Sequence, residues 1–192
     1  MTSSKNIKPF FSIITPIYNG RRFIKSYLNT LKEQIWQDWE VIIIDDGSND
    51  GTYQYLKELI AGDERFHMYK NNQTKRMKGP YQARNIGINA ASGKWICFLD
   101  IDDIWLPEKL QRQANTIQLN KDLKLLYSGY WRAARGCTKG YRRTPPKLIK
   151  HHQLMAFANP VPMLTACLQT KIAKKVNFKA MHHEDFVYWH EI

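Results

Sequence analysis

Three clusters of polar residues, each directly after a short apolar run, hold the side chains in this sequence best suited to chemistry. They are Thr15–Gly20, Asp45–Thr52 and Asp100–Asp103. Together they contain six aspartates, which would repel one another if they met in space. A divalent cation that carries a phosphate ligand would offset this repulsion, because hard cations take oxygen ligands. The clusters therefore indicate a site for a metal-bound phosphate compound.

Each cluster also has a purely structural interpretation. The sequences DGS and NDG within 45–52 are typical of turns and helix N-caps. The sequence YNG at 18–20 is also a good turn, and DID at 100–102 is short enough to arise by chance. The three clusters in this order and at these intervals are more specific than any one of them.

The apolar runs alternate with helical patterns, and this alternation predicts how the clusters meet. We expect strands at 10–15, 39–45, 66–71, 94–100 and 123–128, and helices at 21–35, 51–60, 81–91 and 107–119. Repeated strand–helix alternation predicts an α/β fold with a Rossmann-like, mainly parallel sheet and helices on both faces. In such open sheets ligands bind beyond the carboxyl ends of the strands, where all three clusters would lie.

After residue 129 the pattern weakens, because glycines and prolines interrupt it. We expect loops and one or two short helices there. The length of 192 residues suits one domain. We divide it into an N-terminal tail at 1–9, an α/β region at 10–128 and a basic region at 129–192 of the same domain.

The charge of this last region is uneven. The chain has 29 Lys and Arg against 17 Asp and Glu, a formal net charge of +12. Residues 123–183 contain twelve basic and no acidic residues, so the remainder is balanced at 17 of each. Seven of the twelve lie in the stretch Trp131–Lys150. Such a surface attracts phosphates, anionic lipid head groups or nucleic acid, and a solvated basic face is the simpler alternative.

The sequence lacks the features of integral membrane proteins and of conventionally secreted proteins. No apolar run approaches the roughly 18–20 residues that cross a bilayer, and the N-terminus has no signal-peptide core. Cys97, Cys137 and Cys167 have neither metal-ligand nor redox spacing, which indicates reduced thiols. We therefore expect a cytoplasmic protein, which would lie at the inner face of the membrane if its basic region contacts an anionic membrane surface.

The segments ITPIYNG, WEVIIIDDGSNDGT and ARNIGINAASGKWICFLDIDDIWLPEKL together resemble the family 2 glycosyltransferases of the GT-A fold. The similarity is close over 10–120, weak over 121–180, and returns at HEDFVYW (183–189), which is similar to the family's Glu-Asp and downstream Trp motif. The resemblance implies a GT-A-type sheet with a short acceptor-side region at the C-terminus. It also implies inverting transfer of a sugar from a nucleoside diphosphate donor, a UDP-sugar, to a hydroxyl of a glycan or lipid-linked glycan in polysaccharide biosynthesis.

The resemblance also implies a nucleotide-sugar site. It places Pro16 and Tyr18 against the base and ribose, with Asp46 accepting a hydrogen bond from a base N–H; a tyrosine ring can stack on a base. Arg84 lies in the family's next nucleotide-contacting stretch and would meet the base or a phosphate. An exposed helical arginine is the equally open alternative.

Asp100 and Asp102 match the family's Asp-x-Asp motif. By resemblance, Asp100 reaches the ribose and metal-bound water, while Asp102 ligates Mn²⁺ or Mg²⁺ that bridges the diphosphate. Such a cation stabilises the negative charge of the departing group as a Lewis acid. Asp103 is expected to orient the turn or cap the following segment rather than to touch the metal.

The C-terminal motif supplies the remaining candidates. Asp185 matches the family's catalytic base, which takes the proton of the acceptor hydroxyl during in-line attack. Glu184 would contact the acceptor or metal-bound solvent, and Trp189 would pack beside the acceptor sugar. A solvated acidic pair and a core aromatic are the structural alternatives.

Other functions stay open at this point. The chain ends at Ile192, soon after the base motif, so it is a naturally short member, a truncation or a degenerate copy that binds sugar nucleotide without transfer. A non-catalytic basic module for anionic lipid or nucleic acid is a further alternative, although the chain lacks an aromatic-basic RNA motif or a basic recognition helix. A nucleotidyltransferase would need a glycine- and lysine-rich phosphate loop, which ITPIYNGRR does not supply.

Overall fold

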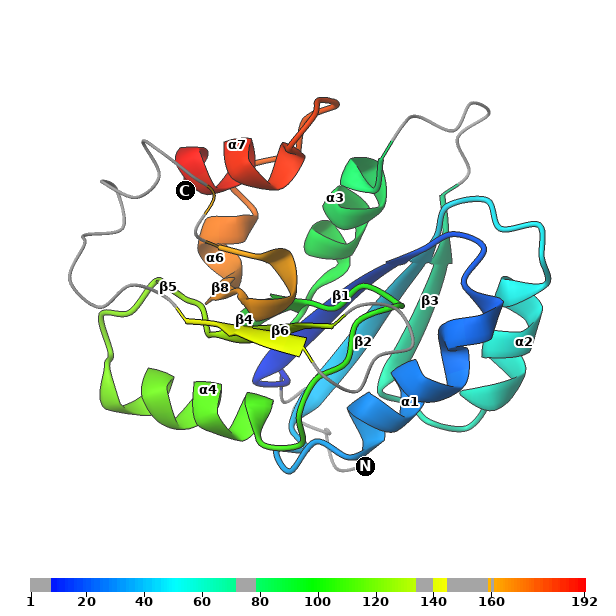
Figure 1. Cartoon of the computed structure of the whole chain (residues 1–192), viewed down its shortest axis with the longest axis horizontal. Coiled ribbons are helices and arrows are strands. Elements are labelled where there is room, and N and C mark those ends of the chain that lie inside the picture. The colour runs from blue at the N-terminus through cyan, green and yellow to red at the C-terminus, as the bar shows by residue number, and fades with distance from the viewer. Residues whose placement is uncertain (1–7, 72–78, 134–139, 145–158, 160) are drawn as a thin grey trace, which may run out of the picture.

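One six-stranded sheet runs through the computed structural model, which describes residues 8–71, 79–133, 140–144, 159 and 161–192 (Figure 1). Its strand order is β3-β2-β1-β4-β8-β5, and β6 and β7 form a separate two-stranded sheet. The strands are β1 (Phe11–Ile17), β2 (Trp39–Asp45), β3 (Phe66–Lys70), β4 (Trp95–Phe98), β5 (Leu125–Leu126), β6 (Tyr130–Ala133), β7 (Gly140–Arg143) and β8 (Cys167–Gln169). β1 to β4 are mutually parallel, and β8 runs antiparallel to β4 and β5. The predicted α/β fold with a mainly parallel sheet is confirmed.

Helices cover both faces of this sheet because its strands are apolar on both sides. In β1, for example, Ile13 packs into one core and Ile14 into the other, as the alternation of side chains along a strand requires. In Figure 1, α3, α6 and α7 lie above the sheet, and α1 and α4 lie below it. The helices are α1 (Ile24–Lys32), α2 (Thr52–Leu59), α3 (Tyr81–Ala90), α4 (Lys109–Leu119), α6 (Thr170–Ala173) and α7 (Glu184–Glu191), with 3₁₀ turns η1 (Arg21–Phe23) and η2 (Met163–Thr165).

The first strand continues past the proline at which we expected it to end. Pro16 pairs in register with Ile44 of β2, and β1 ends at Ile17. The strand tolerates this proline because β4 pairs with β1 only as far as Ile14. Beyond that point the missing N–H of Pro16 removes no ladder hydrogen bond.

The region after residue 129 holds more strand than the expected loops and short helices. β8 inserts between β4 and β5, and the hairpin of β6 and β7 is not hydrogen-bonded into the main sheet. Three residues are too few to show an alternating pattern, which is why β8 is not visible in the sequence. The division of the chain near residue 128 stays a prediction.

The insertion of β8 brings two cysteines together that the sequence places far apart. Cys97 of β4 and Cys167 of β8 lie directly opposite each other, and both are free, fully buried thiols. The reduced state of the cysteines stays a prediction. Cys137 lies outside the described residues. So do residues 1–7 of the predicted N-terminal tail and the segments 134–139 and 145–158 of the basic region. Among the described helices, none is long and apolar enough to cross a membrane.

Helix α3 lies unusually close to the sheet at Gly87. A Cβ atom on this residue would come within 2.5 Å of Ile14 Cγ2 and 2.9 Å of Ile44 Cδ1. Both distances are shorter than a van der Waals contact, so only glycine allows this approach. Gly87 therefore lets α3 pack closely against β1 and β2.

We expect Gly87→Ala to destabilise the protein by roughly 1–3 kcal/mol, because the core must open to admit the methyl group. The free energy of unfolding in urea measures this effect. Asn89→Ala on the exposed side of the same helix is the control and should change stability little. Equal stability of the two variants would show that α3 is not held against β1 as described.

Candidate functional site

The loops after β1 and β2 are hydrogen-bonded to each other. Asn19 N–H donates to Ser48 Oγ (3.0 Å), and Asn49 N–H donates to Asn19 Oδ1 (2.9 Å). Asn19 adopts a left-handed conformation with φ of 49°, which asparagine tolerates better than most residues. The first and second polar clusters therefore form one continuous surface at the carboxyl ends of the strands.

The third cluster packs against the first. A Cβ atom on Gly20 would lie 3.0 Å from Ile101 Cγ2, so the loop after β1 rests directly on the buried Ile101 side chain. Asp100 and Asp102 flank this residue in sequence. All three clusters thus lie on one edge of the sheet, as the parallel strand order predicts.

The predicted base-binding residues lie in the first two loops. Pro16 is half-buried at the end of β1, and the Tyr18 side chain is 39% exposed. Asp46 Oδ1 accepts a hydrogen bond from Asn71 Nδ2 at 2.7 Å, and the same Asn71 nitrogen lies 3.3 Å from Gln82 Oε1. Asp46 is thereby tied to the end of β3 and to α3.

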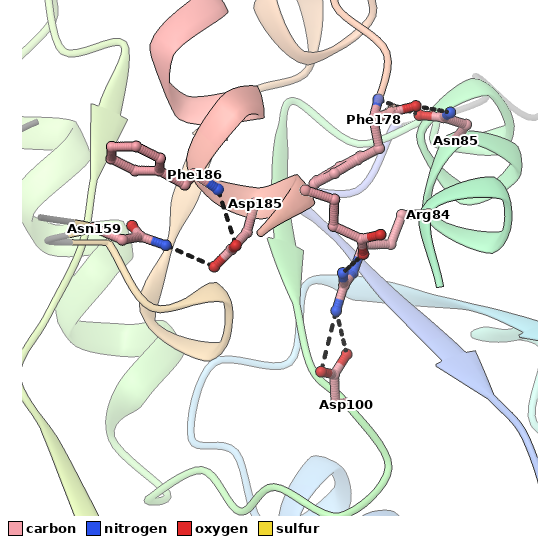
Figure 2. A network of polar contacts seen from close by, with 8 residues as sticks. Arg84, Asn85, Asp100, Asn159, Phe178, Asp185 and Phe186 are labelled. Atoms are coloured by element: carbon pink, nitrogen blue, oxygen red, sulfur yellow. Dashed lines mark hydrogen bonds and ion pairs between the residues drawn. The ribbon is translucent and has the colours of Figure 1, made fainter. Parts of the chain in front are cut away.

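Arg84 is the centre of the candidate site (Figure 2). Its side chain, 6% exposed, forms an ion pair through Nη1 with Glu184 Oε1, and Nη2 lies 3.2 Å from both carboxylate oxygens of Asp100. The guanidinium therefore joins three elements: α3, the segment after β4 and the first turn of α7. The alternative of an exposed helical arginine is wrong.

Glu184 is buried, so the alternative of a solvated acidic pair is wrong for this residue. Burial raises the pKa of Glu184, and the Arg84 guanidinium opposes that rise. Gly79, with φ of 99°, lies on the other side: a Cβ atom there would be 3.1 Å from Glu184 Oε2. The carboxylate is thus enclosed between a cation and a glycine.

Negative charge is crowded in the third cluster. Burial, followed by the nearby carboxylates of Asp100 and Asp102, raises the pKa of Asp103 to about 7. The Asp103 N–H donates to Asp100 O at 3.1 Å, which closes the turn that we expected this residue to orient. Asp102 is exposed to solvent.

Asp185 lies beside Glu184 in the first turn of α7, but it faces a different partner. Asn159 Nδ2 donates to Asp185 Oδ2 at 2.7 Å, and the Phe186 N–H donates to Asp185 Oδ1 at 2.9 Å (Figure 2). The positive end of the helix dipole also favours a carboxylate here. Asp185 is half-buried, so a ligand could reach it from solvent.

Trp189 lies in the core rather than on a surface. It is 3% exposed, and its ring contacts that of Phe98 edge-to-face with 6.3 Å between centroids. This placement favours the core-aromatic alternative over a contact with an acceptor sugar.

Several residues of the site were missed in the sequence. Asn85 fixes the approach to α7 through two reciprocal hydrogen bonds with the backbone of Phe178, at 2.9 and 2.8 Å. Its position next to Arg84 in the ARN motif was the available signal. Asn71 and Asn159 lie outside every motif, so no sequence signal pointed to them.

A groove of about 510 Å³ lies elsewhere, at the amino ends of the strands, and is lined by residues that include Lys94 and Thr170. It is not part of this site, because the polar clusters occupy the opposite edge of the sheet.

The architecture is that of the GT-A glycosyltransferases. The crystal structure of S. aureus TarS 1-349 matches with a TM-score of 0.76 and 24% identity, over 94% of this chain and 54% of that chain. The mannosyltransferase PcManGT from Pyrobaculum calidifontis, solved with GDP-Man and Mn²⁺, matches with a TM-score of 0.67 and 18% identity, over 91% of this chain and 49% of that one. The family model "Glycosyl transferase family 2" matches residues 12–169, and the chain belongs to this family.

Curated relatives agree with this assignment. The Escherichia coli protein WfgD, a UDP-Glc:alpha-D-GlcNAc-diphosphoundecaprenol beta-1,3-glucosyltransferase, is 30% identical over 93% of this chain and 67% of its own length. TuaG of Bacillus subtilis, a putative teichuronic acid biosynthesis glycosyltransferase, is 35% identical over 65% of this chain and 48% of its own. The chain thus spans about two thirds of WfgD and about half of TuaG and of TarS 1-349.

The Arg84–Glu184 ion pair predicts strong energetic coupling. We expect Arg84→Gln to cost roughly 3 kcal/mol or more of stability, because it leaves buried carboxylates without a counter-charge. Arg84→Gln combined with Glu184→Gln should cost less than the sum of the single changes, by about 1–3 kcal/mol. Urea unfolding of the four proteins measures the coupling.

The matched control pairs Arg84→Gln with Glu108→Gln, an exposed glutamate at the start of α4. These two changes should be additive within about 0.5 kcal/mol. Additive effects for Arg84 and Glu184 as well would contradict the ion pair.

Proposed function

We propose that the protein is an inverting glycosyltransferase that moves a sugar from a UDP-sugar donor to a hydroxyl of a lipid-linked glycan. The observation that carries this proposal is the Arg84 bridge: one buried guanidinium holds Asp100 of the Asp-x-Asp motif next to Glu184, whose neighbour Asp185 matches the family's base. This bridge supports the proposal that donor and base residues share one edge of the sheet. The relative WfgD, whose name specifies UDP-Glc and a diphosphoundecaprenol-linked acceptor, supports this choice of substrates.

On the donor side, the nucleoside would lie across the loops after β1 and β2. The exposed ring of Tyr18 offers a stacking face beside Pro16, and Asp46 offers a hydrogen-bond acceptor that discriminates between base edges. Asn71 orients the Asp46 carboxylate through its hydrogen bond at 2.7 Å. Asp100 would reach the ribose while it keeps its contact with Arg84.

The carboxylates after β4 fit a divalent cation that is bound mainly through substrate. Mn²⁺ and Mg²⁺ take oxygen ligands, and Mg²⁺ in particular is held by one or two carboxylates plus phosphates and water. Among the described residues no group of three or more potential ligands forms a closed metal site, and Asp102 is exposed. Burial and, after it, the carboxylates of Asp100 and Asp102 raise the pKa of Asp103. We propose Asp102 as the protein ligand; the bound cation would stabilise charge on the departing diphosphate.

We propose Asp185 as the general base. Its half-buried carboxylate lies at the start of α7, where the Asn159 amide orients it through a hydrogen bond. A base opposite the leaving group takes the proton of the acceptor hydroxyl as that oxygen attacks the sugar. Because the attack comes from the face opposite the leaving diphosphate, the configuration of the anomeric centre is inverted. Glu184, held by Arg84, positions this turn rather than meeting the acceptor with its Oε1.

The setting proposed for the reaction is the cytoplasmic side of a membrane. A UDP-sugar is a soluble donor, whereas a diphosphoundecaprenol-linked acceptor, as in the name of WfgD, has a lipid tail. The protein would therefore act as a peripheral enzyme on an acceptor held at the membrane surface.

Nucleotide binding should depend on both the base and the cation. In the presence of Mn²⁺, UDP at about 100 times its dissociation constant should stabilise the protein by about 2.7 kcal/mol, a rise of several degrees in melting temperature. Asp102→Ala should lose the part of this rise that requires Mn²⁺, whereas Asp122→Ala, at an exposed carboxylate after α4, should keep it. A larger shift with GDP, CDP or dTDP than with UDP would reject the donor assignment.

Removal of the base should slow transfer without weakening donor binding. We expect Asp185→Asn to lower kcat by roughly 10²–10⁴-fold, because the acceptor hydroxyl loses its proton acceptor. The stabilisation by UDP and Mn²⁺ should be unchanged. The assay measures UDP release from UDP-glucose with a diphosphoundecaprenol-linked acceptor. Wild-type kcat in Asp185→Asn would end the assignment of this residue.

A further inference from the structure

The hairpin of β6 and β7 is a separate two-stranded sheet whose side chains the proposed site does not use. Register pairs place Trp131 opposite Arg142 on one face, and Arg132 opposite Tyr141 on the other. Trp131 is 62% exposed and Tyr141 49% exposed. The hairpin therefore presents large aromatic rings and guanidiniums to solvent on both faces.

Among the described residues, no carboxylate balances the positive charge of the hairpin. In the part of the chain that the structure describes, Arg132, Arg142 and Arg143 form no ion pair with a carboxylate, and the sequence has no acidic residue between 123 and 183. The Arg143 guanidinium lies over the Tyr141 ring, 5.0 Å from its centroid. Arg132 and Arg143 also contact the Tyr141 side chain, but neither they nor Arg142 has a carboxylate partner that would offset the charge offered to an external anion.

The combination of rings and guanidiniums is more specific than a solvated basic face. Arginine pairs with phosphate oxygens through two parallel hydrogen bonds, and tryptophan and tyrosine favour the interface between lipid head groups and hydrocarbon. A solvated face would gain nothing from the exposed Trp131 ring. A rigid macromolecular partner would cover one face of the hairpin, whereas a layer of head groups surrounds both.

We propose that the hairpin of β6 and β7 docks the protein on an anionic lipid bilayer, with Trp131 and Tyr141 at head-group level and the arginines on lipid phosphates. The need for such docking rests on the proposed function, because a lipid-linked acceptor lies in a membrane. The binding itself does not, since it requires neither nucleotide nor catalysis. The two proposals can therefore fail separately.

Vesicle sedimentation without nucleotide tests the proposal. The wild type should bind vesicles of phosphatidylcholine and phosphatidylglycerol, more weakly at high salt, and bind much less to phosphatidylcholine alone. Each basic side chain near an anionic surface contributes about a fivefold gain in affinity, so R132Q/R142Q/R143Q should weaken binding about 100-fold. Trp131→Phe should remove emission that brominated lipids quench.

The matched control is K25Q/K57Q/K121Q, which removes the same charge from exposed lysines of α1, α2 and the loop after α4. It should keep most of the vesicle binding, and both triple variants should keep the melting-temperature shift with UDP and Mn²⁺. If R132Q/R142Q/R143Q fails to fold, Trp131→Ala and R142Q are measured instead and should each weaken binding. Equal losses in the two triple variants, equal binding to neutral vesicles, or binding to RNA in place of vesicles would overturn the proposal.

Discussion

A buried guanidinium between two carboxylates is the constraint on which the candidate site depends. Burial of an arginine side chain to 6% exposure costs desolvation free energy unless carboxylates pair with the guanidinium. Arg84 meets this requirement with Asp100 and Glu184, which come from different elements. The first turn of α7 is thus fixed relative to the end of β4, and Asp185 is fixed with it.

The two cores of the protein make this bridge possible. The helices α3, α6 and α7 share the core on one face of the sheet, so Arg84 and Glu184 start on the same side. Gly87 lets α3 approach β1 closely. The hydrogen bonds between Asn85 and the Phe178 backbone hold the segment before α7 against α3. Packing therefore brings the charged groups within reach, and the ion pairs set their final positions.

Much of the fold follows from local sequence. The run WEVIIID forms β2 over the same seven residues, because a long, continuous apolar run with polar ends has few alternatives to a buried strand. β8 has three residues and no comparable signal. The path of β1 through Pro16 depends on where β4 stops pairing, which is a property of the neighbouring strand.

The candidate site likewise has features that the sequence predicts and features that depend on tertiary packing. The strand order brings the three aspartate clusters to one edge, and the motifs that resemble the family identify them. The burial of Arg84 could not be predicted, because its partners lie 16 and 100 residues away and both orientations of a helical arginine were open. The same holds for Asn159, which contacts Asp185 from within the basic region, and for Trp189, whose burial follows from the packing of α7 on Phe98.

A crystal structure of the protein with UDP and Mn²⁺ would test the central assignment most directly. Our account requires the uracil to lie beside Tyr18 and Asp46, and the diphosphate and cation to lie at Asp102. It also requires Asp185 to face the position next to the β-phosphate that the donor sugar would occupy. Nucleotide bound at the amino ends of the strands, or Asp185 turned away from the diphosphate while Arg84 keeps both carboxylates, would contradict it.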